Sequence, residues 1–263
     1  RAMIGAGFAV RALDEAAPLA PQLAMNDVLF LGSFVSESES YAAFWAEVSG
    51  NVASLHGWIA AGGTVVQMTQ ADQTEASPRF LPELGDPRMS AMRTDVDTTT
   101  VLALAPGHVL VDAVLTEAAP AGTAPGTPSR LPSWSAHHRA GAWEAFSTFE
   151  GMRVLAGEST LLRRPALLEG AHGKGRVVLA ALHFDKLDGT TEEGAAFLAA
   201  PDDFVEVSRR WFRGLQDYVG QVRSGQATEV VPSAPWVAPA PAPFVDGSFT
   251  IAVLPDTQVY RSG

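Results

Sequence analysis

The sequence predicts an α/β fold: a doubly wound, mostly parallel sheet with flanking helices. Short, continuous apolar runs at 28–31, 64–68 and 177–182 are typical of parallel strands buried on both faces. A helical pattern at 40–60 separates the first two runs, which predicts one right-handed βαβ unit. Hydrophobic residues make up 47% of the 263 residues and charged residues 18%, so the chain has enough apolar material for a large core.

The first elements follow in order along the N-terminal part. Residues 2–8 read as the end of a helix that closes at Gly7, and an extended piece over 8–13 follows. In the helix predicted over 40–60, one side carries apolar residues at spacings of three and four. Ala61, Gly62 and Gly63 end that helix before the strand at 64–68.

The middle of the chain is predicted to be largely irregular. Residues 69–100 and the low-complexity stretch 117–133 read as loops. Between them lie two apolar segments, 101–104 and 109–115, which are separated by a turn at Pro106–Gly107.

A strand pair over 149–156 and 161–168 is predicted to lead into a glycine-rich turn at 170–175 and then into the strand 177–182. Two acidic residues, Asp202 and Asp203, open a helix that runs to about Gly225 and has one apolar face.

Three regions differ in composition. Residues 1–225 are predicted to form the α/β domain, and residues 226–247 a Pro/Ala-rich, extended linker. Residues 248–263 begin a new strand and read as the start of a truncated second domain.

The net charge of −11 argues against nucleic-acid partners and against anionic membrane surfaces. No apolar run approaches the ~20 residues that span a bilayer, so no membrane insertion is expected. The chain has no cysteine, which excludes disulfides, thiolate metal ligands and thiol catalysis. The compartment stays open, with secretion or the cell surface favoured by the modular arrangement and its tether.

The strand predicted at 177–182 ends in His183-Phe184-Asp185. An imidazole and a carboxylate at the carboxyl end of a parallel strand lie where open α/β sheets place their binding sites. The plainer interpretation is that these polar residues cap a neighbouring loop, and both interpretations stay open.

Residues 1–190 resemble the class I glutamine amidotransferase-like superfamily, through the strands at 28–31 and 64–68 and the late strand with His183 and Asp185. The resemblance implies a nucleophile cysteine after the second strand and a His-x-Glu pair after the late strand. Here His183 and Asp185 match the pair, with Asp one methylene shorter than Glu. The nucleophile region is Met68-Thr69-Gln70-Ala71-Asp72, which leaves Thr69 where the cysteine would be. The resemblance also implies a flavodoxin-like, amidotransferase-like sheet with a further strand before residue 1.

Residues 249–258 resemble the start of calcineurin-like metallophosphoesterases, in which an Asp at the end of the first strand begins a dinuclear metal site. The resemblance implies metal-binding roles for Asp256 and Gln258. Because the remaining ligands have no counterpart in this chain, we expect no cofactor for the chain alone and a divalent metal (Mn, Fe or Zn) only in a longer parent.

We therefore expect a non-catalytic accessory or interaction module of a larger metallophosphoesterase-type protein, with a protein partner or a neighbouring domain. One alternative is a hydrolase, either the parent's phosphoesterase or an enzyme that uses the crevice around Thr69, His183 and Asp185. Another is a structural subunit that forms homo-oligomers by exchange of the strand at 249–254.

Overall fold

The structure is a computed structural model. It describes residues 2–32, 35, 39–46, 50–68, 90–96, 101–115, 130–131, 143–158, 162, 164–182, 184–185 and 203–234.

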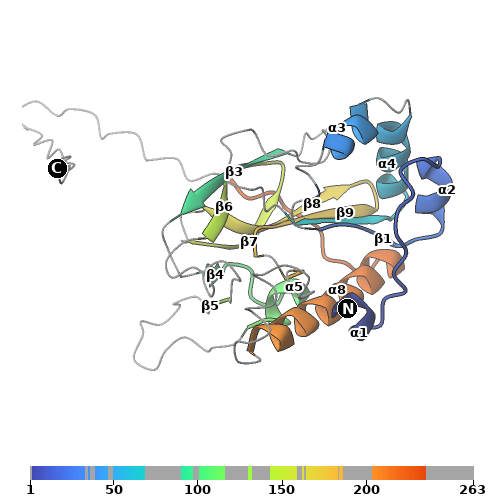
Figure 1. The fold of residues 1–263 in the computed structure, drawn as a ribbon. Helices are drawn as coiled ribbons and strands as arrows, with labels where there is room; N and C mark the ends of the chain where they lie inside the picture. Colours follow the sequence, from blue (N-terminus) through green and yellow to red (C-terminus); the bar gives the residue numbers. More distant parts are fainter. Residues whose placement is uncertain are drawn as a thin grey trace, which may run out of the picture.

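The molecule is an α/β structure built around one large sheet, as the sequence predicts (Figure 1). In spatial order, the seven strands are β1 (Val28–Leu31), β2 (Thr64–Met68), β9 (Gly175–Ala180), β8 (Pro165–His172), β7 (Arg153–Gly157), β4 (Val101–Ala103) and β5 (Arg130–Leu131). A separate pair joins β3 (Ser90–Val96) and β6 (Trp143–Glu150), which are antiparallel.

Three neighbouring strands of the large sheet run parallel. β1 pairs with β2, which places Val28 opposite Thr64. β2 pairs in turn with β9, which places Met68 opposite Ala180. The predicted parallel arrangement of these three apolar runs is confirmed, and their carboxyl ends lie at the same edge of the sheet.

The rest of the sheet is antiparallel, so the sheet is mixed and the prediction of a mostly parallel sheet is wrong. β9, β8, β7, β4 and β5 each run opposite to the next strand in that order. The physical reason is visible between β8 and β9, where the turn at Gly173 and Lys174 connects the two strands directly. A turn this short joins only antiparallel neighbours, because a parallel pair needs a crossover of about a dozen residues.

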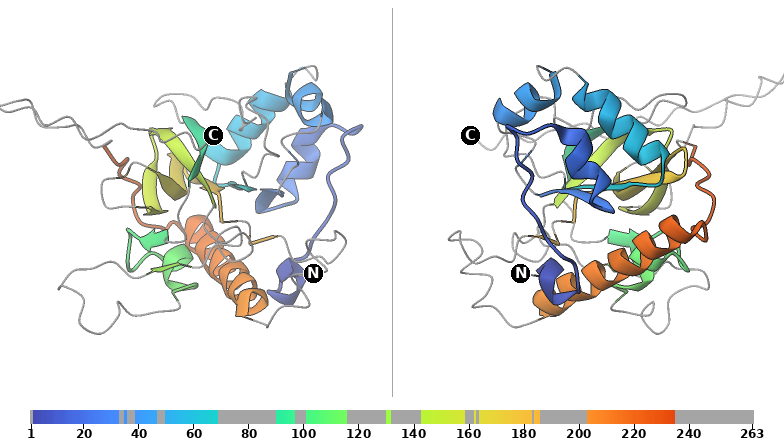
Figure 2. Two further views of the ribbon diagram at one scale, coloured as in Figure 1. Left: turned by 60° about the vertical axis from the view of Figure 1, so that its left-hand side comes forward. Right: turned by 90° about the vertical axis from the view of Figure 1, so that its right-hand side faces the viewer.

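Helices cover both faces of the sheet (Figure 2). One face carries α1 (Ala2–Gly5), α5 (Val109–Asp112) and the long helix α8 (Asp203–Ser224). The other face carries α2 (Leu19–Ala24), α3 (Glu39–Ala46) and α4 (Asn51–Ala60), together with apolar side chains of β6. Each face has its own hydrophobic core, because successive side chains of β2 and β9 point alternately to the two sides.

Several boundaries differ from the predicted ones. The helix expected over 40–60 is two helices, and Gly50, with a φ of 92°, precedes the second. The strand expected over 149–156 is likewise divided into β6 and β7, at Gly151 with a φ of 69°. Both glycines adopt the left-handed conformation that other residues avoid. The strand β3 lies in a stretch expected to be irregular, and its partner β6 begins 47 residues after β3 ends, at Trp143 after Val96, so the pairing is a long-range one.

The segment after α8 follows the body of the domain as far as residue 234. The Thr228 carbonyl oxygen accepts a hydrogen bond from the Arg176 guanidinium at 3.2 Å. Ser233 donates its N–H to the Met152 carbonyl at 2.9 Å, and its Oγ accepts from the Val154 N–H at 3.0 Å. Residues 235–263, which include most of the predicted linker and the predicted strand at 249–254, lie outside the described residues.

Candidate functional site

The edge formed by the carboxyl ends of β1, β2 and β9 is the site that the sequence predicts. Thr69 directly follows β2, and His183 follows β9 by three residues. Both residues lie outside the described part of the chain, as do Asp256 and Gln258. The pairing of Met68 with Ala180 shows that the strands leading to Thr69 and His183 are direct neighbours.

Asp185 is described, and it reaches this edge. A Cβ atom built on Gly32, the residue after β1, would lie 3.1 Å from Asp185 Oδ2. The carboxylate that follows β9 therefore lies against the end of β1, two strands away. Gly32 leaves the space that this approach needs.

The turn that carries Asp185 is fixed to the rest of the molecule by its neighbours. The Ala181 N–H donates to the Ala166 carbonyl at 2.9 Å. The Phe184 ring is fully buried and stacks on Trp211 of α8, with ring centroids 4.9 Å apart. Ser208 of α8 donates its hydroxyl to the Phe184 carbonyl oxygen. Helix α8 thus determines where the residues after β9 lie.

A second polar cluster lies inside the molecule and was not predicted. It joins Glu169 of β8, Arg176 of β9, His108 before α5 and Tyr218 of α8, all 8% exposed or less. The Tyr218 hydroxyl donates to Glu169 Oε1. His108 Nε2 lies 3.4 Å from Glu169 Oε2, and Arg176 Nε lies 3.9 Å from Glu169 Oε1.

The partners of Glu169 determine its charge. Burial alone raises the pKa of this carboxyl, but the hydrogen bond and charge of His108, the Tyr218 hydroxyl and Arg176 outweigh it, so the pKa lies below its ordinary value. Burial, followed by the neighbouring negative charge of Glu169, raises the pKa of Tyr218 well above its ordinary value. The favoured state is therefore a carboxylate that accepts from a neutral phenol.

Two members of the cluster, His108 and Arg176, also bond to backbone groups. His108 Nδ1 accepts the Leu110 N–H at 3.3 Å and so caps the start of α5. The Arg176 guanidinium donates to the carbonyl oxygens of Gly175 at 3.0 Å and of Thr228 at 3.2 Å. The cluster joins α5, α8, β8 and the segment after α8, which is a structural role. The one signal for it in the sequence is a lone Glu inside the apolar run 166–171.

The glycine-rich turn before β9 packs on helix α4. The Lys174 N–H donates to the Ala60 carbonyl at 2.9 Å, and a Cβ atom on Gly175 would lie 2.0 Å from the Ile59 carbonyl oxygen. At the turn, Gly173 has a φ of 58°. The glycines therefore allow the turn to contact the end of α4 closely.

Among the described residues, no group of three or more His, Asp or Glu side chains is placed to hold a metal ion. In the same part of the chain, no helix combines the length and apolar character needed to cross a membrane.

No protein-family model matches this chain, and no curated protein matches it in sequence. Solved structures show weak similarity. A beta-galactosidase from Rahnella sp. R3 is 15% identical over 82% of this chain, with a TM-score of 0.43, and the match covers 25% of that enzyme. A cytoplasmic protein from Salmonella typhimurium is 15% identical over 82% of this chain and 78% of its own, with a TM-score of 0.37. An exo-beta-1,4-mannosidase from Opitutaceae bacterium strain TAV5 is 14% identical over 64% of this chain and 23% of its own, with a TM-score of 0.33. At these TM-scores the similarities support neither a fold family nor an activity.

Proposed function

We propose that this chain is a non-catalytic, amidotransferase-like module of a larger metallophosphoesterase-type protein, and that it acts by binding a protein partner or a neighbouring domain. One observation carries the proposal. β2 and β9 pair directly and in parallel, so the positions after both strands share one sheet edge, in a chain with no cysteine.

The chemistry of amide transfer explains why the missing cysteine matters. A thiolate attacks the amide carbon, an imidazole moves the proton, and a carboxylate orients the imidazole. In the proposal, His183 and Asp185 are the remnants of the last two groups. No residue of the chain can supply the thiolate, so no thioester intermediate can form.

The same proposal includes a flavodoxin-like, doubly wound arrangement of the sheet and helices. β1, the helices α3 and α4, and β2 succeed one another as in a βαβ unit. Helices lie on both faces of the sheet, as in a doubly wound fold. In the proposal, the antiparallel strands from β8 to β5 extend a flavodoxin-like parallel core.

A hydrolase is the second candidate, and the position of Asp185 at the strand ends favours it. In this version, Thr69 is the nucleophile and His183 the base. A hydroxyl needs a preorganised oxyanion hole to act in this way.

In the proposal, the longer parent has a metal site whose first ligands are Asp256 and Gln258. A carboxylate and an amide oxygen suit a hard divalent cation, but two ligands do not hold a catalytic pair of metals. We therefore expect no Mn²⁺-dependent hydrolysis of phosphodiesters by this chain.

Turnover assays test the proposal. The purified chain and its His183→Ala variant are each incubated with glutamine, with an activated amide and with an activated ester. We expect no turnover above buffer for either protein. Turnover by the natural chain that is lost in His183→Ala would show that the site is catalytic and overturn the proposal.

A further inference from the structure

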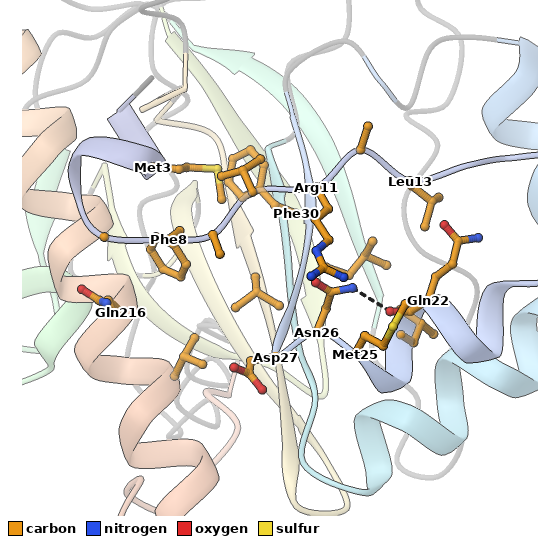
Figure 3. A pocket seen from close by; sticks show the side chains of 18 of the residues that line it. Met3, Phe8, Arg11, Leu13, Gln22, Met25, Asn26, Asp27, Phe30 and Gln216 are labelled. Carbon is orange, nitrogen blue, oxygen red and sulfur yellow. Dashed lines mark hydrogen bonds between the residues drawn. The ribbon is translucent and has the colours of Figure 1, made fainter.

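A cavity of about 530 Å³ lies along the outer edge of β1 (Figure 3). β1 is the last strand of the large sheet on this side and pairs only with β2 in the described part of the chain. Residues of α2 and α8 line the cavity from the two faces of the sheet. Residues 8–13, here called the crossing segment, pass from α1 to the α2 side and line it as well.

Backbone groups of β1 that have no partner among the described residues face this cavity. Thr64 donates its N–H to the Asp27 carbonyl at 3.1 Å, so Asp27 and Leu29 direct their polar backbone groups toward β2. By alternation, Val28 and Phe30 direct theirs outward. Among the described residues no strand pairs with this side of β1. An edge of this kind is a template for another strand.

Exposed apolar side chains gather around the same cavity. Val10 and Met25 line it and are 52% and 64% exposed. Ile4, 63% exposed, follows the lining residue Met3. These are three of the five large apolar side chains that the described residues expose, and a concentration of this kind is typical of a binding surface.

The cavity is also lined by Arg11, whose side chain makes no ion pair or hydrogen bond within the described part of the chain. Figure 3 shows the side chain of Arg11 directed along the cavity from the crossing segment. By contrast, Arg223, which also lines the cavity, binds Asp27 at 2.7 Å. An acidic group on a bound molecule would therefore have a partner at Arg11.

We propose that this edge binds an extended peptide, which adds to the sheet beside β1. The peptide carries apolar residues at alternate positions, packs them against α2 and α8, and places an Asp or Glu at Arg11. A single extended chain is the occupant rather than a second copy, because a second copy would bring its own α2 and α8 against these helices. Peptide binding at this edge is a specific form of the interaction role proposed above and rests on it.

Selection from a library of random dodecapeptides displayed on phage tests this proposal. We expect enriched peptides to alternate apolar residues and to carry an acidic residue. Their synthetic forms should bind about tenfold more weakly to Arg11→Gln, because a charge-assisted hydrogen bond is lost. Binding to Arg213→Gln should be unchanged, since Arg213 is an exposed arginine of α8 that does not line the cavity.

Backbone pairing has its own test. Each selected peptide is made with N-methyl groups on every second amide, in both possible registers. We expect one register to lose binding and the other to keep it, because only one set of N–H groups faces β1. No enrichment, equal binding in both registers, or equal binding to Arg11→Gln would each overturn the proposal. Glutamine turnover is measured separately, so failure of the non-catalytic role and failure of peptide binding are distinguishable.

Discussion

Glu169 keeps its carboxyl at 1% exposure in the middle of the sheet, where an uncompensated charge would be costly. It is stabilised there by partners from three other elements: Tyr218, His108 and Arg176. Because these partners are far apart in sequence, no local pattern predicts the cluster. An isolated Glu in an apolar strand indicates only that some partner is needed.

Replacing Glu169 by Gln should lower the free energy of unfolding by about 3 kcal/mol, because it leaves the buried Arg176 charge uncompensated. Glu158→Gln is the control. Glu158 binds Arg164 at 3.4 Å, but the two side chains are 30% and 45% exposed, so this change should cost at most about 1 kcal/mol. Urea denaturation at neutral pH measures both values. Equal losses for the two variants would show that the buried cluster adds no stability of its own.

The lowered pKa of Glu169 also predicts a loss of stability in acid. A carboxyl whose pKa is lower in the folded state than in the unfolded chain stabilises the fold above the unfolded pKa of about 4.3. That stabilisation disappears as the pH falls through the folded pKa. Urea denaturation at a series of acidic pH values measures the free energy of unfolding at each pH. This free energy should fall more steeply with decreasing pH for the natural chain than for Glu169→Gln. An equal pH dependence of the free energy of unfolding in the two proteins would contradict the lowered pKa of Glu169.

The raised pKa of Tyr218 predicts a loss of stability at alkaline pH. Its pKa is raised in the folded state, so the folded form prefers the neutral phenol, and stability falls as the pH rises above the ordinary value of about 10. Tyr218→Phe removes the titrating group and should reduce this loss of stability at alkaline pH, while it loses the hydrogen bond to Glu169 at neutral pH. If the loss of stability at alkaline pH is unchanged in Tyr218→Phe, another group causes that loss.

The packing of the turn before β9 on α4 determines how closely this helix and this strand approach each other. Gly175 has the Ile59 carbonyl oxygen 2.0 Å and the Gly63 carbonyl oxygen 2.3 Å from the place of a Cβ atom. Both obstacles are backbone atoms, which cannot turn aside as a flexible side chain can.

Gly175→Ala should therefore lower the free energy of unfolding by about 3 kcal/mol or more, through displacement of α4 from β9. Gly57→Ala is the matched control on α4. A Cβ atom there meets nothing within 4 Å, and the exposed helical position should gain about 0.5–1 kcal/mol. Thermal denaturation measures both changes. A tolerated Gly175→Ala would contradict the close contact between β9 and α4.

The elements with strong local patterns are the ones that could be predicted. The runs that form β2 and β9 are largely apolar because both faces of these strands are buried, while β1 has one face buried and the other partly buried. Helix α8 has one apolar side that faces the core. By contrast, the pairing of β3 with β6 depends on partners far apart in sequence. The mixed character of the sheet likewise depends on which strands the short turns connect.

Across the large sheet, the sequence correctly predicts that the carboxyl ends of β2 and β9 lie side by side. Parallel pairing of β2 with β9 places the positions after both strands at one edge, and Asp185 reaches the end of β1 there. The cavity beside β1 could not be predicted in the same way, because it depends on where the crossing segment, α2 and α8 lie in space.

A single engineered thiol tests the claim that positions 69 and 183 lie together at one edge of the sheet, because the natural chain has no cysteine. In Thr69→Cys, the pH dependence of alkylation by iodoacetamide gives the pKa of that thiol. If His183 lies beside position 69 as proposed, its imidazolium form would stabilise the thiolate, so the proposal predicts a value below the ordinary 8.5 or so. Adding His183→Ala should return the pKa to about 8.5. A thiol at position 69 that titrates near 8.5 both with and without His183 would contradict the claim.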